Sequence, residues 1–188
     1  MISEDIDVSK ISLKRSSTKF TRHKTTYHSF LQKIGLILFR FEERGVMPYL
    51  ETSLPTLNPV QASEVIKKAG VLYIAGLGQG DGYHQGLFGP VPVPGVPALN
   101  ALLYGFSKFD LSIQDPRVEQ HNYLILAIFF QKNDRSKILS AFGQINQYIS
   151  LFLSQFPSVQ AFPIDLLQEV IKIVHNLAFC EKKKKRVY

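Results

Sequence analysis

Glycine occupies every second position from Gly76 to Gly82, and such a loop is a candidate for cradling a phosphate. A dinucleotide-binding loop requires G-x-G-x-x-G between a strand and a helix, and a P-loop requires a lysine after its last glycine. Neither pattern fits, because Asp81, Tyr83 and Gln85 break every register of the first and no lysine follows these glycines. We interpret the segment as a lid or a partner-contacting loop, and we expect no cofactor.

The other residues capable of catalysis or metal binding are scattered along the chain. The five histidines never stand three or four positions apart, the spacing that would let two of them share a metal ion on a helix. Asp81 and His84 form a candidate acid–base couple in the glycine-rich loop, but no G-x-S-x-G nucleophile motif accompanies them. Asp110, Asp115 and Glu119 fall in a polar connection, where we expect solvated carboxylates. The sequence therefore predicts neither a metal site nor an enzyme.

The single cysteine, Cys180, excludes an intramolecular disulfide and a multi-thiolate metal site. Since no Cys–His couple is predicted around it, we interpret it as a small hydrophobe packed on a helix. No apolar run reaches the roughly 18 residues that span a bilayer, and the charged N-terminal residues are not typical of a signal peptide. We expect a cytoplasmic protein, either free or peripheral at a membrane surface.

The net charge of +7 is concentrated at the two ends of the chain. Residues 10–33 carry seven basic and no acidic residues, whereas residues 34–181 carry 10 basic and 12 acidic ones. We expect three regions: a basic N-terminal arm (1–28), one folded domain (29–181) and a basic tail (182–188). Basic ends of this kind attract phosphates of nucleic acids or anionic lipids, or serve only as solubilising tails. The residues expected to carry this attraction are Arg22, Lys24, Lys182, Lys183, Lys184, Lys185 and Arg186.

The first half of the folded domain reads as a hairpin followed by a helix. The β-branched and aromatic run 34–41 predicts a buried strand. Gly45 can adopt a positive φ and therefore favours a turn after it. Pro48 places the returning strand 46–54 at a sheet edge. A helix should begin at Asn58 and Pro59, which suit the N-cap and first helical positions. Its predicted apolar stripe consists of Val60, Val65, Ile66, Ala69, Leu72 and Tyr73.

The second half reads as strands followed by helices. The segment 76–97 is rich in Gly and Pro and predicts a loop or an irregular edge strand, with 89–97 as a stiff extended connection. Strands follow at 98–106 and 123–130, the latter apolar on both faces and therefore central. A continuous helix is predicted from Ser136 to Phe156, and a last one opens near Pro163 with Asp165 in its first turn.

This order of strand, strand, helix, strands and two helices across residues 34–179 resembles the longin and roadblock families. The resemblance implies an α+β fold, in which helices pack on a central antiparallel sheet of about five strands in a longin- or profilin-like α/β sandwich. The insertion 76–97 is longer than the corresponding connection in a compact longin domain. The resemblance also implies a noncatalytic scaffold that dimerises or binds small GTPases and trafficking or signalling complexes.

We therefore expect a protein-interaction module whose partner is a small GTPase, a homologous longin or roadblock subunit, or a second copy of the chain. The residues Tyr83, His84, Leu87 and Phe88 of the Gly/Pro-rich insertion are the predicted partner contacts, with Tyr83, Leu87 and Phe88 as exposed anchors. Two alternatives stay open. One is a protein that binds nucleic acid or an anionic membrane through its basic tails, and the other is a small-molecule sensor with a sheet-lined pocket.

Overall fold

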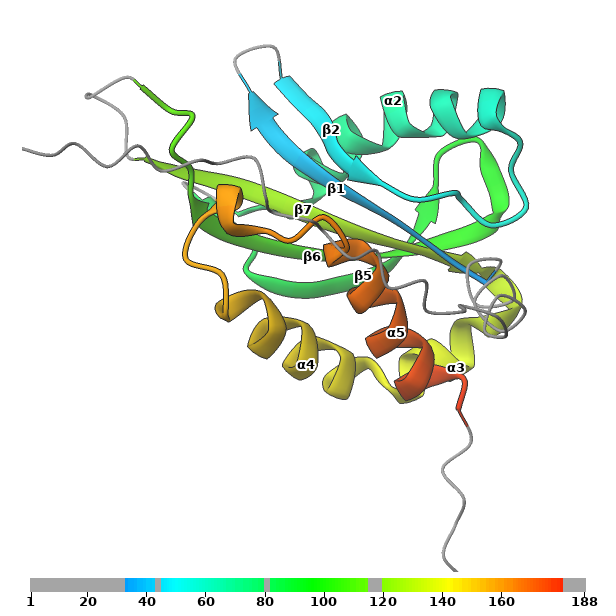
Figure 1. The fold of residues 1–188 in the computed structure, drawn as a ribbon. Coiled ribbons are helices and arrows are strands. Elements are labelled where there is room, and N and C mark those ends of the chain that lie inside the picture. Colours follow the sequence, from blue (N-terminus) through cyan, green and yellow to red (C-terminus); the bar gives the residue numbers. More distant parts are fainter. Residues whose placement is uncertain (1–32, 43–44, 80–81, 115–119, 181–188) are drawn as a thin grey trace, which may run out of the picture.

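The computed structural model describes residues 33–42, 45–79, 82–114 and 120–180. They form a five-stranded antiparallel sheet in the order β2-β1-β7-β6-β5, with helices on both of its faces (Figure 1). The predicted α+β class, with a five-stranded antiparallel sheet in an α/β sandwich, is confirmed. The predicted arm 1–28 and tail 182–188, including all seven basic residues proposed for phosphate contact, lie outside the described residues.

Strands β1 (Ile34–Glu42) and β2 (Gly45–Glu51) form the predicted hairpin. Gly45 adopts a φ of +105°, a conformation that favours glycine, which explains its place at the turn. Pro48 lies in β2, which is an edge strand as predicted, because a proline cannot donate a hydrogen bond to a second neighbour. The register shifts by one residue between Leu38 and Phe39, so the edge of the sheet is irregular there.

The centre of the sheet consists of β7 (His121–Gln131), flanked by β1 and β6 (Val96–Phe109). Nine consecutive residues of β7, from Asn122 to Phe130, are buried, and eight of them make up the predicted strand 123–130. The sequence of a strand is a continuous run of apolar residues when helices cover both faces of its sheet, as they do here. The central position predicted for this strand is therefore confirmed.

Much of the Gly/Pro-rich insertion is strand, forming the short pair β3 (Gly78–Gln79) and β4 (Gly82–Tyr83) and the edge strand β5 (Gly86–Val93). The prediction of an irregular edge strand holds for β5, whose pairing with β6 shifts register twice. The prediction of a loop is wrong for this part of the insertion, because its backbone completes the sheet.

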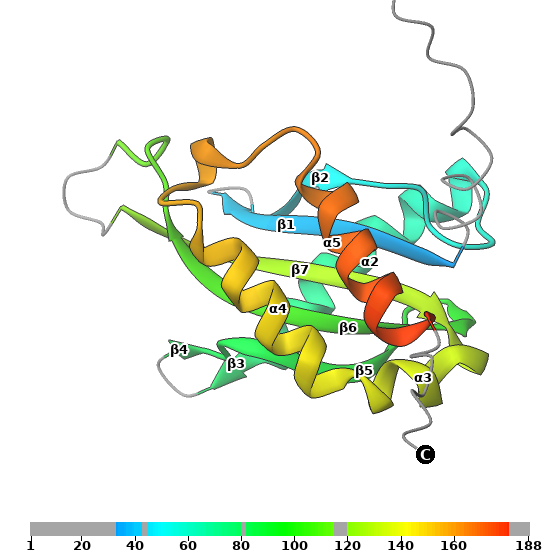
Figure 2. The same ribbon diagram turned by 60° about the horizontal axis from the view of Figure 1, so that its bottom comes forward.

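Helices α3 (Arg135–Ser140), α4 (Phe142–Ser154) and α5 (Leu166–Ala178) lie on one face of the sheet, with short 3₁₀ turns at Lys132–Asp134 and Val159–Ala161 (Figure 2). The continuous helix predicted from Ser136 to Phe156 is wrong, because the backbone leaves helical geometry at Ala141, where ψ is 1°. Ala141 is itself buried, so the apolar periodicity runs through the break and hides it. Helix α5 begins beside Asp165, as expected.

Helix α2 (Pro59–Leu77) lies on the opposite face of the sheet. The sheet therefore separates two clusters of buried hydrophobic residues. One cluster packs between the sheet and helices α3, α4 and α5, and the other lies between the sheet and α2. The surface of interest for function is the one around α2.

Candidate functional site

Helix α2 is fixed at its start by a reciprocal pair of hydrogen bonds. The side chain of Asn58 accepts from the backbone N–H of Gln61 at 2.9 Å, and the side chain of Gln61 accepts from the backbone N–H of Asn58. This capping box satisfies backbone donors at the helix start that have no partner within the helix. At the middle of the helix, Gly70 allows close packing, since an added Cβ would lie 3.1 Å from Phe39 and from Val46. The cap and the glycine together set where α2 crosses the sheet.

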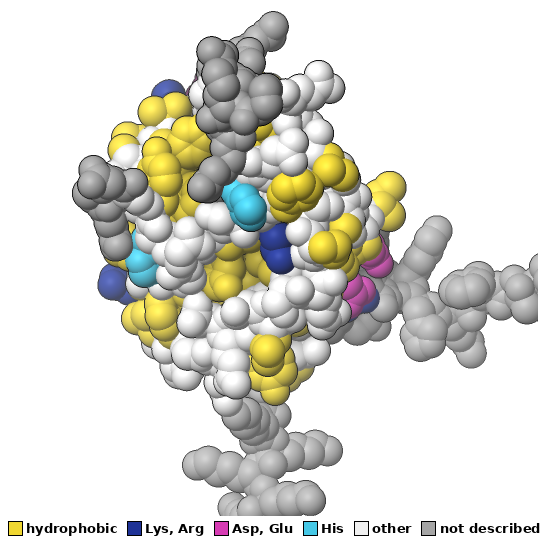
Figure 3. Space-filling view, turned by 90° about the vertical axis from the view of Figure 1, so that its left-hand side faces the viewer, with side chains coloured by type: hydrophobic (Ala, Val, Ile, Leu, Met, Phe, Trp, Pro, Cys, Tyr) yellow, Lys and Arg dark blue, Asp and Glu magenta, His cyan; other side chains and the backbone are white. Residues whose placement is uncertain are grey.

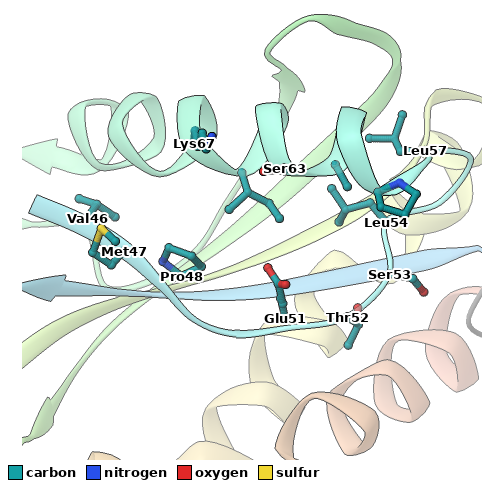
Figure 4. Close-up of a pocket in the computed structure, with 13 residues that line it drawn as sticks. Val46, Met47, Pro48, Glu51, Thr52, Ser53, Leu54, Leu57, Ser63 and Lys67 are labelled. Atoms are coloured by element: carbon teal, nitrogen blue, oxygen red, sulfur yellow. The ribbon is translucent and has the colours of Figure 1, made fainter.

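A groove of about 660 Å³ lies between β2 and the first half of α2; we call it the β2 groove. Figure 4 shows Val46, Met47, Pro48 and Glu51 on the strand side, and Ser63 and Lys67 on the helix side. The connection between the two elements closes the end of the groove with Leu54 and Leu57 (Figure 4). The full lining is Val46, Met47, Pro48, Glu51, Thr52, Ser53, Leu54, Leu57, Pro59, Ala62, Ser63, Ile66 and Lys67.

The β2 groove combines an apolar lining with a few charged and polar groups. Two opposite charges line it, Glu51 from the strand and Lys67 from the helix. The hydroxyl of Thr52 is already engaged, accepting a hydrogen bond from the backbone N–H of Leu36 at 2.8 Å. The described lining also contains serine hydroxyls but no histidine or cysteine. The groove is therefore suited to binding an apolar surface with charges at its border.

Several apolar side chains that the helical periodicity predicts as buried are exposed on α2. Val60 is 72% exposed and Leu72 is 55% exposed, so the prediction is wrong for both. Val71 on the same helix is also exposed, as are Met47 and Tyr49 on β2. Val65, Ala69 and Tyr73 of the same stripe are buried as predicted. The apolar surface of α2 is thus wider than the part that the sheet covers.

A second groove, of about 310 Å³, lies between the last turns of α2 and strand β5; we call it the β5 groove. Of the described residues that line it, Tyr73 is the only one with a polar group on its side chain. The Tyr73 hydroxyl is buried and has no hydrogen-bond partner among the residues that the structure describes. Burial raises the pKa of Tyr73 well above its usual range, so the hydroxyl stays protonated. The full lining is Leu72, Tyr73, Gly76, Phe88, Val91, Pro92, Val93, Pro94 and Leu103.

The four predicted partner residues have different surroundings. Tyr83 is exposed and stacks on Tyr123, with ring centroids 4.7 Å apart. His84 is half-buried, its ring 5.8 Å from that of Phe88, which is exposed and borders the β5 groove. Leu87 is buried in the core below α4, so its prediction as an exposed anchor is wrong. Figure 3 faces the end of the sheet where β4 lies and shows hydrophobic side chains there in several separate patches.

The turn before β5 is fixed to the sheet at one closely packed point. The hydroxyl of Tyr123 donates a hydrogen bond to the backbone carbonyl of His84 at 2.5 Å. A Cβ added at Gly105 would overlap both of these groups, so only glycine fits there. Burial, followed by the nearby Tyr83, raises the pKa of Tyr123 to about 12, which keeps its hydroxyl a donor. This contact explains how the Gly/Pro-rich insertion is held against the sheet.

Only some of the catalytic and metal-binding candidates of the sequence lie in the part of the chain that the structure describes. Asp81, Asp115 and Glu119 lie outside the described residues, so the Asp81–His84 couple stays a prediction. Within residues 33–42, 45–79, 82–114 and 120–180, no group of three or more His, Cys, Asp or Glu side chains is placed to hold a metal ion. Over the same residues, no helix combines the length and the apolar character needed to cross a membrane.

The interpretation of Cys180 as a packed hydrophobe is wrong. Its thiol is exposed at the end of α5 and lies 3.8 Å from Nδ1 of His175, although no Cys–His couple is predicted. The five-residue separation places the two side chains next to each other only because the chain turns after the helix ends at Ala178. Burial, followed by the charge of Lys33, lowers the pKa of His175 and favours its neutral form.

Asp110, which we expected to be solvated, is fully buried, and that prediction is wrong. Its carboxylate accepts hydrogen bonds from Ser112, from Asn122 at 3.1 Å and from Gln160 at 2.7 Å. Burial by itself would raise the pKa of Asp110, but these hydrogen bonds outweigh it and lower the pKa to about 2. The donors come from β7 and from the turn before α5, so this buried carboxylate ties the end of the sheet to the helices.

No protein-family model, curated protein sequence or solved structure matches this chain.

Proposed function

We propose that this protein is a noncatalytic protein-interaction module with a longin- or roadblock-like architecture, and that its partner docks at the β2 groove. The observation that carries the proposal is the groove itself: about 660 Å³ of mainly apolar space beside an edge strand. Exposed apolar patches rimmed by polar residues are typical of protein-interaction sites. Met47 and Tyr49, exposed on the edge strand, extend this surface beyond the groove.

The longin and roadblock resemblance is supported by the order of the elements along the chain. Strands β1 and β2, helix α2, the remaining strands and then helices α3 to α5 follow one another as in the pattern that suggested these families. The proposed partners are those that the resemblance implies: a small GTPase, a homologous subunit, a second copy of this chain, or a trafficking or signalling complex. The proposed location is the cytoplasm, where the protein meets such complexes.

The chemistry of the groove limits what the partner must present. Its apolar lining favours aliphatic or aromatic side chains, and the opposite charges of Glu51 and Lys67 favour a partner with complementary charges on either side. Strand β2 is the outermost strand of its sheet, so a partner segment can also pair with its backbone. Pro48 withholds one donor from that pairing, which restricts it to part of the strand.

The test is affinity capture from native lysate at about 0.15 M salt with the full chain and two tryptophan variants. Ser63 is exposed and lines the β2 groove, so Ser63→Trp fills the groove without removing a core side chain. Lys68 is exposed on the same helix and does not line the groove, so Lys68→Trp is the matched control. We expect a discrete protein partner, identified by mass spectrometry, with the wild type and Lys68→Trp, and its loss with Ser63→Trp.

Equal capture by both variants would place the partner elsewhere on the molecule. The second candidate function, phosphate binding by the basic ends, is favoured by the 12 of 22 basic residues at 10–33 and 182–186. It predicts that nucleic acid or anionic lipid is captured instead, with an affinity that falls steeply between low and physiological salt. A protein partner held by an apolar groove should lose much less affinity over the same range.

A further inference from the structure

The first and the last residues that the structure describes lie at the same end of the sheet. Lys33 precedes β1 and Lys132 follows β7, and these two strands are adjacent and antiparallel. Helix α5 ends there as well, because the ring centroid of its C-cap residue Phe179 lies 5.4 Å from Nζ of Lys33 and 5.6 Å from Nζ of Lys137. Figure 2 shows the start of β1, helix α3 and the end of α5 at this end of the sheet. The residues before 33 and after 180 therefore attach to the fold side by side.

Positive charge is concentrated at the same end. Residues 132–137 carry three basic residues and one acidic one, whereas the other residues of 34–181 carry seven basic and eleven acidic ones. The basic side chains of this end are all exposed, and we call the surface that they form the basic end: Lys33, Lys132, Arg135 and Lys137. The segments attached to it add six basic and no acidic residues at 10–32 and five basic residues at 182–186. Such an uneven distribution orients a protein with its positive end toward a negatively charged surface.

We propose that the basic end docks on a membrane that contains anionic lipids, with Leu139 of α3 in contact with the bilayer interface. Leu139 is 42% exposed and lies four residues after Arg135, on the same face of the helix. Basic side chains are attracted by the negative surface potential of such a membrane, and an apolar side chain beside them gains free energy when it leaves water at the interface. None of these residues lines the β2 groove, so the proposal does not depend on the docking site proposed above.

The composition and the contacts of the basic end favour a membrane over a nucleic acid. Proteins that bind single-stranded nucleic acids stack bases on aromatic rings. The ring of Phe179 is already engaged, because it stacks on His175 with centroids 5.5 Å apart and also contacts the two lysines named above. Three of the four basic residues are lysines, whereas arginine is the residue that recognises nucleic acids through paired hydrogen bonds. The exposed Leu139 gains little beside phosphates but is stabilised at a bilayer interface.

The single cysteine of the chain provides a reporter for the test. Cys180 is exposed and directly follows Phe179, so an environment-sensitive fluorophore on its thiol reports contact at the basic end. In a second full-length protein, Cys180→Ser with Ile164→Cys, the fluorophore lies at the other end of α5, where Ile164 is fully exposed. Both proteins are titrated with phosphatidylcholine vesicles that contain either no phosphatidylserine or about 30% of it. We expect a shift toward the fluorescence of an apolar environment only for the label at Cys180 and only with phosphatidylserine.

Two pairs of variants test the charge and the apolar contact separately. Lys132→Gln should weaken binding to the anionic vesicles about 2- to 5-fold, the effect of one lysine near such a surface. Lys68→Gln, at an exposed lysine of α2, is its matched control and should bind like the wild type. Leu139→Ala should weaken binding by a similar factor, and Leu151→Ala, at an exposed leucine of α4, should leave it unchanged. All four side chains are exposed, so each variant should fold like the wild type.

Several results would overturn the proposal. These are no binding to the anionic vesicles, equal binding to both kinds of vesicle, and an equal response of the two labels. Wild-type affinity in both Lys132→Gln and Leu139→Ala would mean that the chain ends bind lipid without the folded domain. Tighter binding to a single-stranded oligonucleotide than to the vesicles, unchanged in Leu139→Ala, would assign the surface to nucleic acid instead. Ser63→Trp, which fills the β2 groove, should bind vesicles like the wild type, so failure at one surface is distinguishable from failure at the other.

Discussion

The two faces of the sheet are covered to different extents. On one face, α4 and α5 lie side by side and α3 completes the layer (Figure 2). On the other, α2 is the single long helix among the described residues (Figure 1). Five strands about 4.8 Å apart make a surface roughly 20 to 24 Å wide, whereas one helix with its side chains is about 10 to 12 Å across. Two helices can cover such a sheet, and one leaves a strip uncovered on each side.

Both grooves occupy these uncovered strips. The β2 groove lies between α2 and one edge strand, and the β5 groove between α2 and the other. The exposed apolar residues Val60, Val71 and Leu72 lie on α2 itself, the helix that borders both grooves. The two-helix face thus buries the larger of the two hydrophobic clusters, whereas the face with α2 has an apolar groove along each edge of the sheet.

The largest expected difference between the two faces is in the stability lost when one side chain of a covering helix is shortened to alanine. Ile149 of α4 is fully buried against the sheet, so Ile149→Ala should lower the free energy of unfolding by about 2–5 kcal/mol. Leu72 on α2 is more than half exposed, and Leu72→Ala should cost less than about 1 kcal/mol. Urea unfolding followed by circular dichroism measures both. Similar losses would mean that the two faces are equally well packed, contrary to the comparison above.

A second prediction concerns pH, through the buried carboxylate that ties the two-helix face to the sheet. The pKa of Asp110 is about 2 in the fold, below the ordinary 3.8, so its ionised form stabilises the protein above about pH 4. That contribution, about 2 kcal/mol, should be lost as the pH falls from 4 to 2. Denaturant unfolding at several pH values measures it. In Asp110→Asn the free energy of unfolding should not show this loss between pH 4 and pH 2. If the free energy of unfolding fell equally with pH in both proteins, the low pKa of Asp110 would be contradicted.

The sequence was sufficient for most of the elements and for their order because the signals involved are local. The β-branched and aromatic run 34–41, the Asn58-Pro59 start of α2 and the glycine at position 45 each act over a few residues, and all three have their predicted roles. The break at Ala141 was missed because a buried alanine continues the apolar periodicity through it.

The two grooves and the buried carboxylate of Asp110 could not be predicted from local signals, because they depend on how distant segments pack together. Periodicity shows that α2 has an apolar stripe, but it does not give the width of the sheet beneath, so Val60 and Leu72 were expected to be buried. The hydrogen bond from Gln160 to Asp110 joins residues 50 positions apart, and no pattern in the sequence links them. Leu87 looked like part of an exposed loop because its strand is rich in glycine and proline.

A third prediction tests whether the α2 face is open along its whole length. An added Cβ at Gly35 would lie 2.8 Å from the carbonyl oxygen of Ser53 and 2.9 Å from Cα of Leu54, both backbone atoms of the connection to α2. Gly35→Ala should therefore lower the free energy of unfolding by about 1–3 kcal/mol. Gly143→Ala, where the added Cβ meets nothing within 4 Å, is the control and should not be destabilised. Urea unfolding of both variants decides whether this end of the face is closely packed.

The smallest effect contrasts two glycines of α2 itself. Near the end of the helix, Gly76 faces the β5 groove and has room for a Cβ, so Gly76→Ala should raise the free energy of unfolding by about 0.5–1 kcal/mol through its higher helix propensity. At Gly70 the same gain is opposed by a Cβ only 3.1 Å from the buried ring of Phe39, so Gly70→Ala should be destabilising. Thermal and urea unfolding of the two variants measure these opposite signs. A loss of stability in Gly76→Ala would mean that the end of α2 packs as closely as its middle.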